Sequence, residues 1–408
     1  MPSPRPAPAT TLPPEASLVR YAPSLEQVEA DEPETFRALT DTLLEISATT
    51  HADTGRALRS VHAKSHGILR GQLQVLPVDA PWAQGLFATP GVHDAILRLS
   101  TSPGDELDDH VSTPRGIALK VLGVEGERLP GPEHATQDFL FVDGPVFLAP
   151  GPKQFLKSLK LLAATTDRVP SLKRAFSALA RGAEHVLEAV GTSSATLSGL
   201  GGHAIDHPLG ATVYTQVPFR HGTYVAKYAL VPVSRDLALL EGAAVDLDGD
   251  PDGLRAAVSD HVREHGGTWE LRAQLCTSVE DMPIEDASVE WPQDRSPFVT
   301  VARLTVPPQA TPEGDALREQ DEGLSFSPWH GLVAHQPLGG VNRARRPAYE
   351  ASANARSGRA RCPVHEPVRA ARGPGAAASA TPMPPAMTAS PAGGDTSLPV
   401  GSQLGLLD

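Results

Sequence analysis

This sequence of 408 residues has only two cysteines, no long apolar run and no excess of basic residues. The two cysteines, Cys276 and Cys362, lie in unrelated segments, so neither a disulfide framework nor a cysteine-ligated metal site is expected. Without a run of 18 apolar residues, we expect no membrane span. The net charge of −13 argues against nucleic acid or an anionic membrane as a partner.

Aromatic residues make up only 5% of the chain, whereas proline is abundant, with 40 residues. The prolines crowd residues 1–23 and 363–400. We therefore predict a flexible Pro-rich leader over 1–23, a folded domain over 24–356 and a disordered low-complexity tail over 357–408. The leader has no apolar stretch of signal-peptide length, so a cytoplasmic protein is expected.

Hydrophobic periodicity predicts an α+β domain with about eight strands, four on each side of a helical insertion. Closing eight antiparallel strands into a β-barrel removes both sheet edges, so we expect a barrel surrounded by helices, although periodicity alone does not exclude a sandwich. Helices are predicted over 24–60, 155–190 and 234–265, and residues 219–221 as a hairpin connection. The predicted strands are Gly67–Val78, Ala95–Ser102, Arg115–Val124, Gln137–Leu148, Ala211–Pro218, Gly222–Val231, Trp269–Leu275 and Phe298–Val306.

A basic stretch before the predicted tail carries the first chemical signal. Arg345 and Tyr349 are four residues apart and Arg356 follows seven later, so all three share one face of a helix. A cation beside a phenol favours the phenolate, and a tyrosine phenolate can ligate ferric haem. The alternative is a basic amphipathic helix whose tyrosine packs on the body of the protein.

Two other segments place polar residues in apolar surroundings. In Arg98-Leu99-Ser100-Thr101, the first and third side chains point to one face of a strand and need partners if that face is buried. His62 lies in Arg59-Ser60-Val61-His62-Ala63-Lys64, and by itself such a histidine is more often structural than catalytic. His62 and His66 form an H-x3-H pair, but no acidic residue completes a zinc motif, so a metal is not expected there.

Six segments in order resemble the haem catalase superfamily, and specifically its shortened, catalase-related branch. The resemblance covers roughly residues 24–356. The segments are Arg59-x-Val61-His62-Ala63-Lys64; Arg98-Leu99-Ser100-Thr101; Pro114-Arg115-Gly116-x-Ala118-x-Lys120; Pro145-Val146-Phe147; Trp291-Pro292 with Pro297 and Val301; and Phe326-Ser327-Pro328 with Arg345-x-x-x-Tyr349-x6-Arg356.

This resemblance implies roles for single residues. Tyr349 would be the axial ligand of the iron in ferric haem b, with Arg345 hydrogen-bonded to its phenolate. His62 would be the distal acid–base, oriented by Ser100. The remaining haem contacts would come from Arg59, Val61, Arg98, Phe147 and Arg356, of which the three arginines would meet the propionates.

The resemblance departs from the family pattern on the distal side. The asparagine that the family carries there is replaced by Val142 or by Asp143, and Asp143 would then be a second catalytic acid–base. The basic residues that hold NADPH in large catalases have no clear match, so NADPH is not expected.

The implied activity is a haem-dependent oxidoreductase that consumes hydrogen peroxide, as catalase or peroxidase, through a ferryl intermediate. Its partners would be hydrogen peroxide or small organic hydroperoxides and small reductants, in an oxidative stress response, and the chain could form a small homo-oligomer. Val61 before His62 favours this over a lipid hydroperoxide isomerase of the allene oxide synthase kind, which typically has Thr there. A haem-binding protein without turnover is the third alternative.

Overall fold

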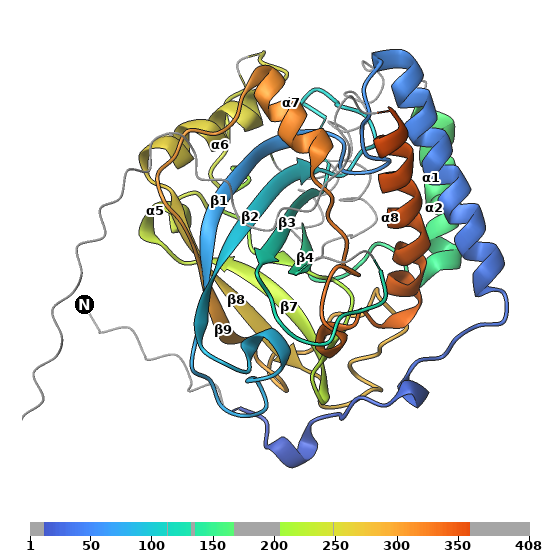
Figure 1. Cartoon of the computed structure of the whole chain (residues 1–408), viewed down its shortest axis with the longest axis vertical. Helices are drawn as coiled ribbons and strands as arrows, with labels where there is room; N and C mark the ends of the chain where they lie inside the picture. The colour runs from blue at the N-terminus through green and yellow to red at the C-terminus, as the bar shows by residue number, and fades with distance from the viewer. Residues whose placement is uncertain (1–11, 112, 132–134, 167–204, 248, 360–408) are drawn as a thin grey trace, which may run out of the picture. The chain divides into compact units, whose positions relative to one another are not determined.

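A closed antiparallel β-barrel forms the centre of the chain in the computed structural model, which describes residues 12–111, 113–131, 135–166, 205–247 and 249–359 (Figure 1). All of them belong to one unit, residues 1–370, and a second unit, 371–408, lies outside the described residues. The strands are β1 (Ser65–Val75), β2 (Gly91–Thr101), β3 (Arg115–Leu122), β4 (Thr136–Asp143), β5 (Val213–Tyr214), β6 (Phe219–His221), β7 (Tyr224–Pro232), β8 (Gly267–Leu275) and β9 (Val299–Val306).

Closure of the barrel depends on the short strand β5, which pairs with β4 on one side and with β7 on the other. Strands β5 and β6 pair one after the other with β7, so the nine strands occupy eight positions around the barrel. The predicted eight-stranded antiparallel barrel is therefore confirmed. Four strands precede the insertion that begins at helix α2, and the five strands after it fill the other four positions.

The hairpin before β7 differs from the prediction. Residues 219–221 are strand β6 and not a connection, and the chain turns at Gly222–Thr223 between the paired residues His221 and Tyr224. Gly222 has φ +61°, which glycine adopts without a steric penalty. The two-residue turn thus extends the hairpin further than hydrophobic alternation indicated.

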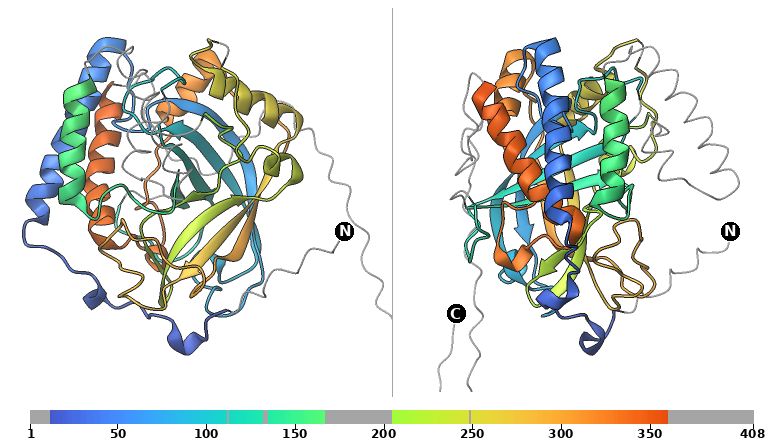
Figure 2. Two further views of the ribbon diagram at one scale, coloured as in Figure 1. Left: turned by 180° about the vertical axis from the view of Figure 1, so that it is seen from behind. Right: turned by 90° about the vertical axis from the view of Figure 1, so that its right-hand side faces the viewer.

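Three long helices pack together on one side of the barrel: α1 (Glu32–Thr54), α2 (Pro152–Thr166) and α8 (Gly339–Arg359) (Figure 2). Helices α5 (Arg235–Ala238), α6 (Gly253–Glu264) and α7 (Gly314–Gly323) lie elsewhere around the barrel. The helix predicted over 24–60 is shorter, because Gly55 with φ +68° ends α1. The region 234–265 holds two helices, and the part of the predicted helix 155–190 beyond 166 lies outside the described residues.

The end of the expected flexible leader is packed against the barrel. Leu18 is buried, the Val19 N–H donates to the Cys276 carbonyl at 2.9 Å, and the Tyr21 N–H donates to the Thr223 carbonyl at 2.8 Å. The folded part of the chain therefore begins before residue 24. In the parts of the chain that the structure describes, no helix has both the length and the apolar composition needed to cross a bilayer.

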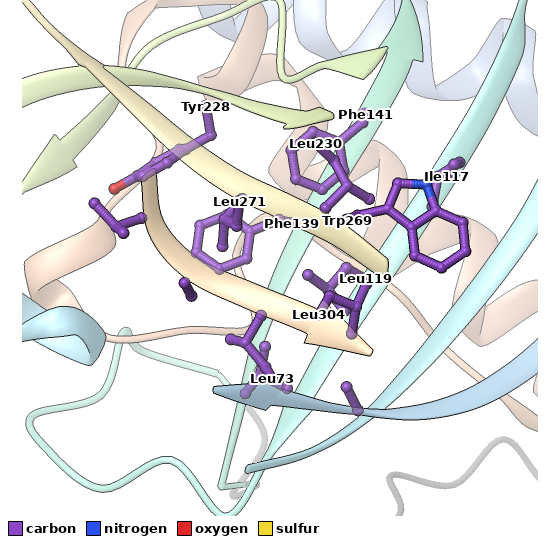
Figure 3. Packing of buried hydrophobic residues seen from close by; sticks show 14 of the residues in the cluster. Leu73, Ile117, Leu119, Phe139, Phe141, Tyr228, Leu230, Trp269, Leu271 and Leu304 are labelled. Atoms are coloured by element: carbon purple, nitrogen blue, oxygen red, sulfur yellow. The ribbon is translucent and has the colours of Figure 1, made fainter. Parts of the chain in front are cut away.

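The barrel interior is filled with large apolar side chains, among them Phe139, Tyr228 and Trp269 (Figure 3). Strand alternation sends Leu97 and Leu99 of β2 into this core. Arg98 and Ser100 therefore share the opposite, outward face of the strand, and the sequence predicted that they share a face. The packed core supplies stability, while the polar face of the same strands is left for the groups outside the barrel.

Buried histidines predict that acid destabilises the fold. Burial lowers the pKa of His62 to about 3 and those of His207 and His221 to about 4, so their contribution is complete above about pH 6.5 and is lost as pH falls toward 4. Burial raises the pKa of Asp143 to about 7, so protonation of this carboxyl stabilises the fold as pH falls. This is one group against three histidines, so the net effect of acid is destabilising. We expect a lower free energy of unfolding in urea at pH 5 than at pH 7, by about 1.4 kcal/mol per pH unit for each proton taken up. Equal values at the two pH values would contradict this prediction.

Candidate functional site

A pocket lies against the outer face of strands β2, β3 and β4, between the barrel and helices α1 and α8. It has about 760 Å³ of empty space, including its open mouth. The predicted site residues that line it are Arg59, Val61, His62, Arg98, Ser100, Arg345, Tyr349 and Arg356. Segments far apart in sequence therefore meet in one place.

The pocket carries positive charge without an acid on its wall. Arg59, Arg98, Arg345 and Arg356 line it, and none of its described lining residues is Asp or Glu. One carboxylate lies behind the wall: Asp321 accepts from Arg59 Nη1 at 2.9 Å and from Arg98 Nη2 at 3.1 Å. Burial opposes ionisation of Asp321, but the two guanidinium groups hold its pKa well below the usual range. Asp321 thus neutralises only part of the charge.

Arg356 is the least satisfied of these arginines. Its side chain is 97% buried, and its guanidinium donates to the carbonyls of Glu322 at 3.1 Å and Leu324 at 3.3 Å. Its Nε is buried without an acceptor among the described residues. Burial lowers the pKa of Arg356 to about 10. Because a buried unpaired donor costs free energy, this arrangement favours an anionic ligand in the pocket.

His62 lies in the segment before β1, beside the end of β2, and its backbone conformation is unusual. Its φ is +55°, its backbone N–H donates to the Ser102 carbonyl at 2.8 Å, and its Nδ1 lies 3.0 Å from Ser100 Oγ. A Cβ on Gly116 would lie 2.7 Å from His62 Cε1, so only glycine leaves room for the ring. Burial and then the charge of Arg98 lower the pKa of His62 to about 3. The imidazole is therefore neutral at neutral pH and can accept a proton.

Helix α8 presents Arg345 and Tyr349 together. Arg345 Nη2 donates to Tyr349 Oη at 3.1 Å, and its Nη1 donates to Asn342 Oδ1 at 3.2 Å. Asn342 is itself fixed, because its Nδ2 donates to the Pro218 carbonyl at 2.9 Å. The tyrosine therefore faces the pocket with a hydrogen-bonded cation at its oxygen.

Two predicted site residues do not reach the pocket. Phe147 packs against Phe155, with ring centres 4.9 Å apart, and is not among the lining residues. Asp143 accepts from the Arg115 backbone N–H at 2.8 Å, away from the lining, whereas its neighbour Val142 lines the pocket. Strand alternation explains the difference, because successive side chains of β4 point to opposite faces. The structure thus gives no support to Asp143 as the second acid–base or to Phe147 as a haem contact.

Two residues with a clear part in the site were not singled out from the sequence. Asp321 lies in an acidic stretch, and nothing in its spacing distinguishes it from Glu319 or Glu322. Gly116 belongs to a quoted motif, but its closeness to His62 depends on the pairing of β2 with β3. Among the described residues, no group of three or more His, Cys, Asp or Glu is placed to hold a metal ion.

Comparison with known proteins shows the fold. No family model and no curated protein matches this sequence. A fungal catalase of known structure has a TM-score of 0.52 and 17% identity over 76% of this chain and 61% of its own. Catalase A from Saccharomyces cerevisiae has a TM-score of 0.53 and 16% identity over 76% of this chain and 63% of its own. The fold is therefore catalase-like, and the chain spans less than two thirds of the length of these catalases.

Replacing Asp321 by Asn tests the charge balance behind the pocket. The substitution leaves Arg59 and Arg98 buried without their counter-charge, so the free energy of unfolding should fall by about 3–5 kcal/mol. Chemical denaturation measures the change. The matched control is Asp315→Asn, which breaks the exposed pair with Arg318 and should change stability by less than about 1 kcal/mol. An Asp321→Asn protein as stable as the control would show that the buried carboxylate is dispensable.

Proposed function

We propose that this chain binds haem b in the pocket and uses it to consume peroxide as an oxidoreductase. The observation that carries the proposal is a pocket with four arginines, one phenol, a neutral imidazole and no described acidic lining residue. With Asp321 counted, three positive charges are left over, and two propionates and a phenolate would balance them. No other group suggested by the sequence combines two carboxylates with a centre that a phenolate can ligate.

The propionates would be held by Arg59, Arg98 and Arg356. These three guanidinium groups converge on the segment from Asp321 to Leu324, which supports a shared anionic partner. The unpaired Nε of Arg356 would gain an acceptor. Val61 and the apolar part of the lining would contact the flat face of the ring.

Tyr349 would hold the haem through its iron, because a phenolate is a suitable donor to ferric haem. When bound, the haem supplies a redox-active iron at which a peroxide can be cleaved. Arg345 stabilises negative charge on the tyrosine oxygen through its 3.1 Å hydrogen bond. The position of Tyr349 on helix α8, fixed through Arg345 and Asn342, orients that oxygen.

His62 would move the proton. As a neutral base it would take the proton from one peroxide oxygen and return it to the other oxygen, which leaves as water or as an alcohol. Ser100 holds one ring nitrogen, which leaves the other to carry the proton. The side chain of Val142 offers no hydrogen bond where the family carries an asparagine, so bound hydrogen peroxide would be held less firmly. We therefore include small organic hydroperoxides, reduced with a small reductant, among the substrates.

Reconstitution with haem tests the binding half of the proposal. The purified chain should take up one haem and develop a high-spin ferric Soret band. In Tyr349→Phe the band should be displaced or lost, because the axial phenolate is removed. Tyr214→Phe is the matched control, since Tyr214 lies outside this pocket, and should resemble the wild type. Failure of the wild-type chain to bind haem would overturn the proposed function.

Gly116→Ala tests the role of His62 without altering its chemistry. The new Cβ would displace the imidazole, so the rate of the peroxide-dependent absorbance change should fall by about 100-fold, the usual contribution of a general acid–base. Haem content should be unchanged. Gly91→Ala is the control, because its Cβ meets nothing within 4 Å. A wild-type rate in Gly116→Ala would remove His62 from the mechanism, and haem uptake without any peroxide reaction in the wild type would favour a carrier.

A further inference from the structure

A chain of three hydrogen-bonded side chains is buried in the barrel core, and it takes no part in the pocket described above. It consists of His221 on β6, Tyr228 on β7 and His335 in the 3₁₀ turn Val333–His335. All three side chains are fully buried. Tyr228 Oη lies 2.8 Å from His221 Nδ1 and 3.0 Å from His335 Nδ1, so the phenol is placed between two imidazoles.

The backbone groups at the two ends of this series of side chains fix the direction of every hydrogen bond in it. The Leu86 N–H donates to His335 Nε2 at 2.9 Å, so a neutral His335 carries its proton on Nδ1 and donates to Tyr228. His221 Nε2 lies 3.0 Å from the Trp82 carbonyl and must donate to it, which leaves His221 Nδ1 as an acceptor. Burial keeps both rings neutral, because it lowers the pKa of His221 to about 4 and that of His335 well below its usual value. The Tyr228 hydroxyl therefore donates to a neutral base.

Packed aromatic rings connect this phenol with the pocket. Phe141 lines the pocket and is also part of the barrel core. Its ring centre is 6.3 Å from that of Phe139, which in turn is 5.0 Å from that of Tyr228 (Figure 3). Two ring-to-ring steps thus lead from the wall of the pocket to the Tyr228 phenol.

We propose that Tyr228 is a redox-active residue that delivers one electron to the pocket while its proton moves to His221. The inference rests on the proposed function, because the oxidant is a haem that peroxide has oxidised above its ferric state. The haem gains one electron, the Tyr228 O–H bond breaks, and a new N–H bond forms at His221 Nδ1. The products are a neutral phenoxyl radical and an imidazolium, and one electron from a small reductant with return of the proton restores both.

A base beside the aromatic side chain decides which residue can donate the electron. An oxidised phenol is a far stronger acid than an imidazolium, so His221 takes its proton even though burial lowers the pKa of that histidine. Trp269 lies in the same core, but its indole N–H is buried without an acceptor among the described residues, and the same holds for Trp82. Oxidation of either tryptophan would leave the positive charge on the indole ring itself, because no base accepts its proton. Of these three core residues, Tyr228 alone has a destination for its proton.

Freeze-quench electron paramagnetic resonance on the haem-loaded full chain tests the inference. Within seconds of mixing with hydrogen peroxide, the wild type should show a phenoxyl radical whose signal narrows when the protein carries ring-deuterated tyrosine. Tyr228→Phe should lose at least 90% of that signal, and Tyr214→Phe should retain it. His221→Gln keeps the phenol but cannot take up the proton, so the radical should form at least tenfold more slowly.

Optical spectra of the same samples separate this inference from the proposed function. Absence of haem, or of any peroxide-dependent change in the haem spectrum, would overturn both. Oxidised haem without a tyrosyl signal, or an unchanged signal in Tyr228→Phe, would overturn the redox role of Tyr228 alone. If Tyr228→Phe does not fold, the test rests on the His221→Gln protein. A phenoxyl radical that forms in that variant as fast as in the wild type would overturn the proposal.

Discussion

Buried positive charge is the constraint on which the pocket depends. Arg59, Arg98, Arg345 and Arg356 line it, while Asp321 is the single carboxylate that pairs with any of them among the described residues. Guanidinium groups out of water are costly unless they are paired, so an anion in the pocket would lower the free energy of this arrangement. The hydrogen-bonded phenol and the neutral imidazole line the same pocket as these charges, within a catalase-like fold. The proposal of haem as the ligand depends on this combination of groups.

The fold separates the elements that supply stability from those that supply chemistry. Apolar side chains fill the barrel, so β2 can turn Arg98 and Ser100 outward without weakening the core. Helix α8 is fixed independently of the pocket, because Arg343 pairs with Glu26 at 2.7 Å and with Glu32 at 2.6 Å. These pairs join the start of α8 to the segment before α1 and to the first residue of α1. The rigid helix then carries Tyr349 to a defined place.

Sequence reasoning succeeded where local periodicity or helical spacing decides the outcome. Alternation located the barrel strands and placed Arg98 and Ser100 on one strand face, and four-residue spacing placed Arg345 beside Tyr349. It failed where tertiary contacts decide. Asp143 and Val142 are neighbours on β4, and only their strand register shows which of them faces the pocket. Phe147 lies beyond the end of that strand, and the counter-charge Asp321 comes from a helix whose local pattern gives no signal.

The central claim is that Tyr349 binds haem iron as a phenolate held by Arg345. Resonance Raman spectroscopy of the haem-loaded protein, with excitation in the charge-transfer region of the ferric complex, tests it most directly. The account predicts enhanced phenolate ring vibrations that shift when the protein is prepared with ring-deuterated tyrosine. A haem spectrum with only imidazole or water ligation, unaffected by labelled tyrosine, would contradict the account.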